Sequence, residues 1–232
     1  MNLLSVIVVL ICGAVAAVVL KKLTIAGAVT GTLLGCLIWL GVGWVGIFFM
    51  SAFFLLGTTA TSWGRREKEK LGVAQEAKGK RNAGQVLANG GAGGLLGLIA
   101  YTFPQQVELI TLMIAAAFSS ATADTLSSEL GTIYGKQFYN ILNFKKGRRG
   151  RDGVISTEGL LFGMAGSAFV AIIYAAAFGW DRFFFWIILA GTIGNITDSY
   201  LGATVERKGI IRNDVVNFLN TAVAALFILL II

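Results

Sequence analysis

Four groups of polar side chains interrupt the apolar stretches of this sequence, and carboxylates and amides dominate them. Asp124 follows a run of small and hydroxyl-bearing residues, and Asp198 comes three residues after Asn195 inside another apolar stretch. Asp214 opens a third stretch, and Asn217 continues its face at helical spacing. An ionised side chain in mid-bilayer costs about 2.5–3.5 kcal/mol, so we interpret Asp124 and Asp198 as functional. For Asp214, capping of a helix N-terminus is an alternative explanation.

The fourth group carries amides at helical spacing. Asn82, Gln85 and Asn89 stand at i, i+3 and i+7, and Asn89 also suits a hydrogen bond to a neighbouring helix. Ser128 lies four residues after Asp124 and faces the same way if the helix continues. Carboxylates from separate helices beside basic loops suit Mg²⁺ that bridges to phosphate oxygens. The sequence has no histidine, which excludes histidine acid–base chemistry and histidine metal ligands.

Basic residues gather in two long polar segments, 62–83 and 124–158. Lys80-Arg81 belongs to the first segment, and Lys145-Lys146 begins a run of cations in the second. Either segment is long enough to wrap a nucleotide or lipid phosphate, but attraction to an anionic membrane surface, about 1 kcal/mol per residue, also explains them. The net charge of +7 agrees with the positive-inside bias of membrane proteins and no recognition motif accompanies it, so nucleic-acid binding is not expected.

The elements that must position these residues are membrane helices. The chain is 56% hydrophobic and only 13% charged, whereas about a quarter of the residues in a soluble domain are charged. Apolar runs long enough to span a bilayer recur along the whole sequence. The pattern predicts an all-α polytopic membrane protein, one domain over residues 1–232, with about eight transmembrane helices. They are expected at 3–20, 23–41, 44–61, 84–102, 107–123, 159–179, 183–203 and 215–232.

The basic residues also predict how this bundle is oriented. When the loops are assigned alternately to two sides, every Lys and Arg except Arg182 falls on one side. A missed or added helix in the middle would scramble that sorting, so the bias supports the helix count. The rule that cytoplasmic loops are basic makes this side cytoplasmic and both termini outward. We therefore expect a protein of the cell (inner) membrane whose active site is on the cytoplasmic side, next to its long loops.

Five blocks of this sequence, in the same order, resemble the transmembrane-protein-19 family, whose plant and cyanobacterial members include phytyl-phosphate kinase. The resemblance runs from about residue 60 to the C-terminus, and its blocks are Lys80–Gly91, Ala121–Gly131, Asp152–Gly159, Gly194–Thr204 and Asn213–Thr221. It implies transfer of a phosphoryl group from a nucleoside triphosphate to a prenyl monophosphate, which gives a prenyl diphosphate. The implied partners are the prenyl phosphate lipid, the nucleotide and the bilayer; a homodimer stays open.

The chain is also distantly similar to CDP-diacylglycerol synthases and dolichol kinases, which use CTP, Mg²⁺ and aspartates at membrane level. In those enzymes an Asp is followed by a Gly-Lys element, a basic loop and a Glu-Gly pair. Asp124, Gly135-Lys136, Lys145-Lys146 and Glu158-Gly159 stand here in that order, and Asn195 stands where an acidic residue is common. This similarity implies CTP as the donor.

These observations together define the expected site. The expected catalytic residues are Asp124, Asp198, Asn195 and Lys136. The expected substrate- and nucleotide-binding residues are Lys80, Arg81, Asn82, Asn89, Ser128, Lys145, Lys146 and Asn217. Mg²⁺ is expected at Asp124, Asp198 and Asp214.

Two other functions remain alternatives at this stage. A CTP-dependent cytidylyltransferase would make a CDP-lipid from a phospholipid instead of a diphosphate. A transporter of lipids or anions would carry polar residues through to the outer leaflet. In this sequence the polar residues stop in the cytoplasmic halves of the predicted helices, which favours an enzyme.

Overall fold

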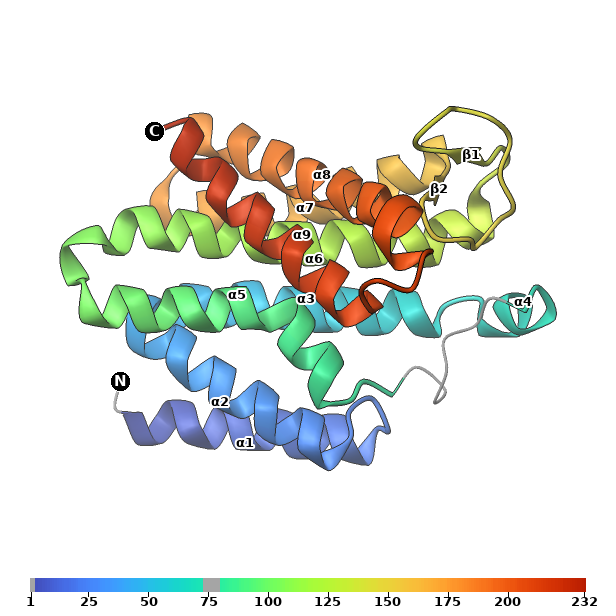
Figure 1. Ribbon diagram of the computed structural model, residues 1–232. Helices are drawn as coiled ribbons and strands as arrows, with labels where there is room; N and C mark the ends of the chain where they lie inside the picture. Colours follow the sequence, from blue (N-terminus) through green and yellow to red (C-terminus); the bar gives the residue numbers. More distant parts are fainter. Residues whose placement is uncertain (1–2, 73–79) are drawn as a thin grey trace.

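The computed structural model describes residues 3–72 and 80–232, which form a helical bundle with one small hairpin (Figure 1). The α-helices are α1 Leu3–Val19, α2 Ile25–Val42, α3 Trp44–Ser62, α4 Arg65–Lys70, α5 Ala83–Thr102, α6 Val107–Tyr134, α7 Thr157–Phe178, α8 Arg182–Leu201 and α9 Asn213–Phe227. Short helical turns are η2 Pro104–Gln106, η3 Gly202–Glu206 and η4 Ile228–Leu230. Strand β1 Tyr139–Asn140 pairs antiparallel with β2 Val154–Ile155.

Helix α6 is the centre of the bundle. It packs against α3, α5, α7, α8 and α9. Its middle is made largely of alanine, serine and threonine, and these small side chains let the neighbouring backbones approach closely. Larger residues such as Ile114 and Phe118 fill the remaining space and are completely or almost completely buried. Asp124 therefore lies on the helix that the other helices surround.

The predicted end of this central helix is wrong. The sequence suggested a helix over 107–123 that Asp124 closes, whereas α6 continues to Tyr134. The added turns are stabilised by tertiary contacts: Gly131 lies against Gly159 of α7, and Glu129 is buried in an ion pair. As a result Asp124 projects from the body of a continuous helix, with Ser128 one turn further along.

Helices α2 and α5 run in parallel and touch along their length. At one end, Leu23 and Arg81 form a parallel bridge, in which the Thr24 N–H donates to the Arg81 carbonyl oxygen at 3.0 Å. At the other end the backbones approach so closely that a Cβ added at Gly41 would lie 2.1 Å from the Gly97 carbonyl oxygen. The bridge at Leu23 and the packing along α2 together fix the start of α5 and the backbone of Arg81.

Six of the described helical segments are long and apolar enough to cross a membrane: α2, α3, α5, η2 with α6, α7, and α9 with η4. The predicted count of eight is not confirmed. The described part of α1 is apolar but shorter, and α8, which is not among the six, carries the polar residues Arg182, Asn195 and Asp198. All eight predicted helices nevertheless occur as helices in the structure.

The two ends of the bundle differ in composition. The start of α1 and the C-terminus lie at the end opposite the β-hairpin and α4 (Figure 1). Of the described basic residues, all except Arg182 belong to the hairpin end or to the connections there. The outward or cytoplasmic placement of these ends stays a prediction.

Candidate active site

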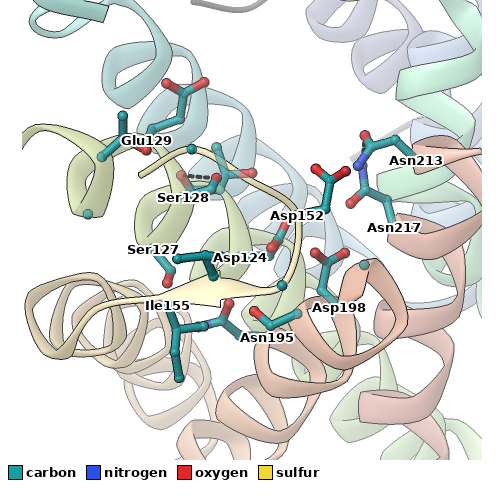
Figure 2. A pocket seen from close by; sticks show the side chains of 18 of the residues that line it. Asp124, Ser127, Ser128, Glu129, Asp152, Ile155, Asn195, Asp198, Asn213 and Asn217 are labelled. Atoms are coloured by element: carbon teal, nitrogen blue, oxygen red, sulfur yellow. Dashed lines mark hydrogen bonds between the residues drawn. The ribbon is translucent and has the colours of Figure 1, made fainter. Parts of the chain in front are cut away.

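A polar cavity of about 350 Å³ opens at the hairpin end of the bundle. Its walls come from α5, α6, α8 and α9, and the loop before β2 contributes Asp152 and Gly153. Figure 2 shows Asp124, Asp152 and Asp198 gathered in this space, with Asn195 beside them. Segments far apart in the sequence therefore contribute oxygen atoms to one place.

The carboxyl groups of Asp124 and Asp198 lie within hydrogen-bonding distance of each other. The Asn220 amide donates to Asp198 Oδ1 at 2.8 Å, and Ser120 Oγ donates to Asn220 Oδ1 at 3.0 Å. Two ionised carboxylates in contact repel each other, and a divalent cation between them removes that repulsion. The pair thus has the chemistry of a cation site.

Two further carboxylates add to the negative charge on this side of the cavity. Asp152 precedes β2, and Glu206 ends the turn η3 that follows α8. Burial raises the pKa of Glu206, and the nearby charges of Asp152 and Asp198 raise it further. The Arg207 guanidinium donates to the Asp152 carbonyl oxygen, which ties the two segments together.

Two buried cations, Arg81 and Lys68, also line the cavity. Arg81 is only 8% exposed, and its Cζ lies 4.8 Å from the centre of the Phe53 ring. Burial lowers the pKa of Arg81 to about 10, so the guanidinium is charged at neutral pH. Next to it, Lys68 Nζ donates to Glu129 Oε2 at 2.5 Å and to the Ala60 carbonyl oxygen at 2.9 Å.

The comparisons with known proteins identify the family. The model of the family described as integral membrane protein DUF92 matches residues 7–225. The chain belongs to this family. It is 34% identical to the uncharacterized membrane protein sll0875 of Synechocystis over 91% of this chain and 84% of that protein. It is 32% identical to protein VTE6, chloroplastic, of Arabidopsis thaliana over 90% of this chain and 65% of that protein.

A third relative of this DUF92 protein is protein PGR of Arabidopsis thaliana, which is 29% identical over 84% of this chain and 77% of that protein. No solved structure is significantly similar to the chain. The relatives match most of the present chain, so the helices that form the cavity fall within the shared region.

The cavity of the DUF92 protein includes many of the residues expected from the sequence. Those that line it are Asp124, Asp198, Asn195, Arg81, Asn89, Ser128 and Asn217. Their positions follow from helix geometry. Asn89 Nδ2 donates to the Gln85 carbonyl oxygen at 3.0 Å, one turn earlier on α5. Asn217 Nδ2 likewise donates to Asn213 Oδ1 at 3.1 Å on α9. The amides thus form the side of the cavity between α5 and α9.

Other expected residues do not line the cavity. Three of them, Lys136, Lys145 and Lys146, are exposed in the connection that contains the hairpin. Lys80 precedes the start of α5. Asn82 caps α5. Its Oδ1 accepts from the Gln85 N–H at 3.0 Å, and Gln85 Oε1 accepts from the Asn82 N–H at 3.0 Å. The pairing of Asn82 with Gln85 is therefore a capping box, which stabilises the helix start.

Asp214 is not brought together with Asp124 and Asp198. It faces the first turn of α5, where a Cβ added at Gly84 would lie 2.6 Å from Asp214 Oδ2. Within residues 3–72 and 80–232, no three Asp, Glu, Cys or His side chains are placed to share a metal ion. The Asp124–Asp198 pair still fits Mg²⁺, because this ion is commonly held by one or two carboxylates together with substrate phosphates.

Several cavity residues were not selected from the sequence. Glu129, Asp152 and Glu206 line the cavity, and so does Lys68, which is 2% exposed. Asp152 begins one of the five blocks of family resemblance, which is a signal that could have found it. Lys68 gave no signal, because it stands among five other charged residues of a six-residue helix.

Proposed function

We propose that this DUF92 protein is a membrane-embedded kinase that transfers a phosphoryl group from CTP to a phytyl-like prenyl monophosphate. The observation that carries the proposal is the contact between Asp124 and Asp198 in a polar cavity that the buried cation Arg81 also lines. The resemblance to the transmembrane-protein-19 family, which includes phytyl-phosphate kinase, supports the substrate class. The relation to VTE6 over 90% of the chain agrees with it.

In the proposed reaction, an oxygen of the prenyl phosphate attacks the γ-phosphorus of CTP. The new P–O bond forms as the bond to the β-phosphate oxygen breaks, so the products are the prenyl diphosphate and CDP. An acceptor that is already a phosphate needs little deprotonation, so the absence of histidine from the sequence is no obstacle. Catalysis then rests on positioning and charge neutralisation.

Different residues of the cavity carry out these tasks. Asp124 and Asp198 would hold Mg²⁺, which neutralises phosphate charge when bound. Asn195 is 3% exposed and lies beside the pair. Arg81 neutralises phosphate charge in the same cavity. We place the reaction on the cytoplasmic side, because the cavity opens at the basic end of the bundle.

Purified protein in lipid nanodiscs, incubated with phytyl phosphate, Mg²⁺ and γ-labelled CTP, tests this function. Label is expected in phytyl diphosphate. Asp124→Asn and Asp198→Asn are each expected to lower kcat at least about 100-fold, because each removes one charge that holds the cation. Asp181→Asn is the matched control, since Asp181 caps α8 at the opposite end, where its Oδ1 accepts from the Phe183 N–H.

Three outcomes would contradict the proposal. Full activity of both Asp124→Asn and Asp198→Asn would show that the site is elsewhere. Cytidine-labelled lipid in place of γ-labelled lipid would indicate a cytidylyltransferase. Movement of lipid or anion across proteoliposomes without nucleotide, and no labelled lipid, would indicate a transporter.

A further inference from the structure

Arg81 differs from the other buried cation at the cavity. Lys68 has an ion-pair partner in Glu129 and also donates to the Ala60 carbonyl oxygen. Among the residues that the structure describes, Arg81 has no ion-pair partner, and its buried Nη1 has no hydrogen-bond acceptor. The charges of Glu129 and Asp124 act on the guanidinium, but neither carboxylate accepts a hydrogen bond from Nη1. Leaving a buried donor without an acceptor costs free energy, and a ligand oxygen recovers it.

Contacts of both its backbone and its side chain hold Arg81 in place. Its backbone is fixed by the bridge to Leu23, in which the Arg81 N–H donates to the Lys22 carbonyl oxygen at 2.9 Å. Its side chain lies over Phe53 and fits against Gly57 of α3, where an added Cβ would be 2.7 Å from Arg81 Nη2. A donor that is fixed before the ligand arrives loses little entropy on binding.

The guanidinium lies inside the bundle, at the level of Thr125, which neighbours Asp124 on α6. Phe53 and Gly57 come between one and three helical turns before α3 ends at Ser62. At 1.5 Å per residue, the guanidinium lies roughly 8–13 Å inside the hairpin end of α3. A phosphate attached to a prenyl chain enters from the bilayer, whereas a nucleotide arrives from water at the loops.

We infer that Arg81 binds the phosphate of the lipid acceptor, in the cavity that it lines together with Asp124 and Asp198. Guanidinium is suited to this task, because its planar N–H groups match the oxygens of a phosphate. The Asp124–Asp198 pair is left for the cation and the nucleotide phosphates. This inference rests on the proposed function for the identity of the lipid, but binding can be measured without turnover.

The test compares phytyl phosphate with phytol as ligands of the purified protein, without nucleotide or Mg²⁺, by the shift in melting temperature. In the wild type, phytyl phosphate is expected to stabilise the protein more than phytol does. Arg81→Gln is expected to abolish that difference. Gly57→Ala keeps the charge of Arg81 but displaces its guanidinium, so it is expected to reduce the difference between the two ligands. This variant replaces Arg81→Gln in the test if Arg81→Gln does not fold.

Arg149→Gln is the matched control for Arg81→Gln. Arg149 Cζ also lies 4.8 Å from a phenyl ring, that of Phe138, but its Nη2 donates to the Gly135 carbonyl oxygen at 2.9 Å. It does not line the cavity, so Arg149→Gln is expected to keep the full difference between phytyl phosphate and phytol.

Kinetics give a second readout where the wild type is active. Arg81→Lys is expected to raise the KM for phytyl phosphate at least tenfold, because the loss of one charge-assisted hydrogen bond weakens binding by about that factor. The KM for CTP is expected to stay unchanged. The inference is overturned if the wild type binds phytyl phosphate and phytol equally, or if the KM for CTP rises instead. Phosphate-dependent binding that needs Arg81, in a protein without kinase activity, would refute the proposed function and keep the anion subsite.

Discussion

The orientation of Asp198 depends on a short chain of hydrogen bonds between three helices. Asn220 of α9 is completely buried and donates its amide to Asp198 of α8, while Ser120 of α6 donates to the Asn220 side-chain oxygen. Because both polar atoms of the Asn220 amide are used, the Asp198 carboxylate has one preferred direction, toward Asp124. The position of a single buried amide thus sets the geometry of the carboxylate pair.

Replacement of this amide tests the role of the chain of hydrogen bonds. Asn220→Ala is expected to lower kcat about 10- to 100-fold, the usual effect of losing a partner that orients a metal-binding carboxylate. Thr221→Ala is the control, because the Thr221 hydroxyl donates to the Phe218 carbonyl oxygen of its own helix. It is expected to lower the melting temperature and leave kcat unchanged. Equal kcat in the two variants would rule out an orienting role for Asn220.

At the scale of elements, the contact between α6 and α8 decides how close the two aspartates come. Gly191 and Gly194 face α6, and Cβ atoms added there would lie 2.2 Å from Ser119 Oγ and 2.0 Å from Ser120 Oγ. Small residues in such positions are what allows membrane helices to pack closely. The close approach of the α6 and α8 backbones therefore brings Asp124 and Asp198 together.

Gly194→Ala is therefore expected to push α8 away from α6. The overpacking is expected to cost about 1–3 kcal/mol of stability and to lower activity by separating the carboxylates. Gly31→Ala on α2 is the control, since its added Cβ would have Val86 Cγ1 at 3.8 Å as its nearest described neighbour. Melting temperature and labelled-product formation, measured for both variants, check this. The idea fails if Gly194→Ala is as stable and active as Gly31→Ala.

On the scale of the whole molecule, charge is distributed unevenly between the two ends. The hairpin end carries the polar cavity and nearly all described cations, while the other end has short connections such as that between α7 and α8. The positive-inside bias predicts that the hairpin end faces the cytoplasm. A nucleotide-dependent reaction requires the same orientation, because nucleotides are supplied there.

Cysteine labelling tests the orientation directly. Cys12 and Cys36 are both free and are first replaced by alanine. Lys145→Cys and Asp181→Cys then place one thiol at each end of the bundle. A membrane-impermeant maleimide is expected to label Asp181→Cys in intact cells and Lys145→Cys only after lysis. Labelling in the reverse order would place the cavity outside the cell.

The sequence by itself predicted the membrane helices and the residues that interrupt them. The reason is that transfer into a bilayer depends on each segment's own composition and length, so local sequence is sufficient. Asp124 and Asp198 were recognised in the same way, because an ionisable residue in an apolar segment is costly and usually has a function. The family resemblance added the class of reaction, which composition and spacing do not specify.

The tertiary structure decided which of the polar residues share one cavity. Ser120 and Asn220 are 100 residues apart in sequence, and Lys68 and Glu129 are 61 apart, yet each pair is in direct contact. Asp214 looks like Asp198 in the sequence but faces α5, because the rotation of α9 about its axis is fixed by packing. Such contacts depend on which helices become neighbours and how far they rotate, and packing across the whole bundle sets both.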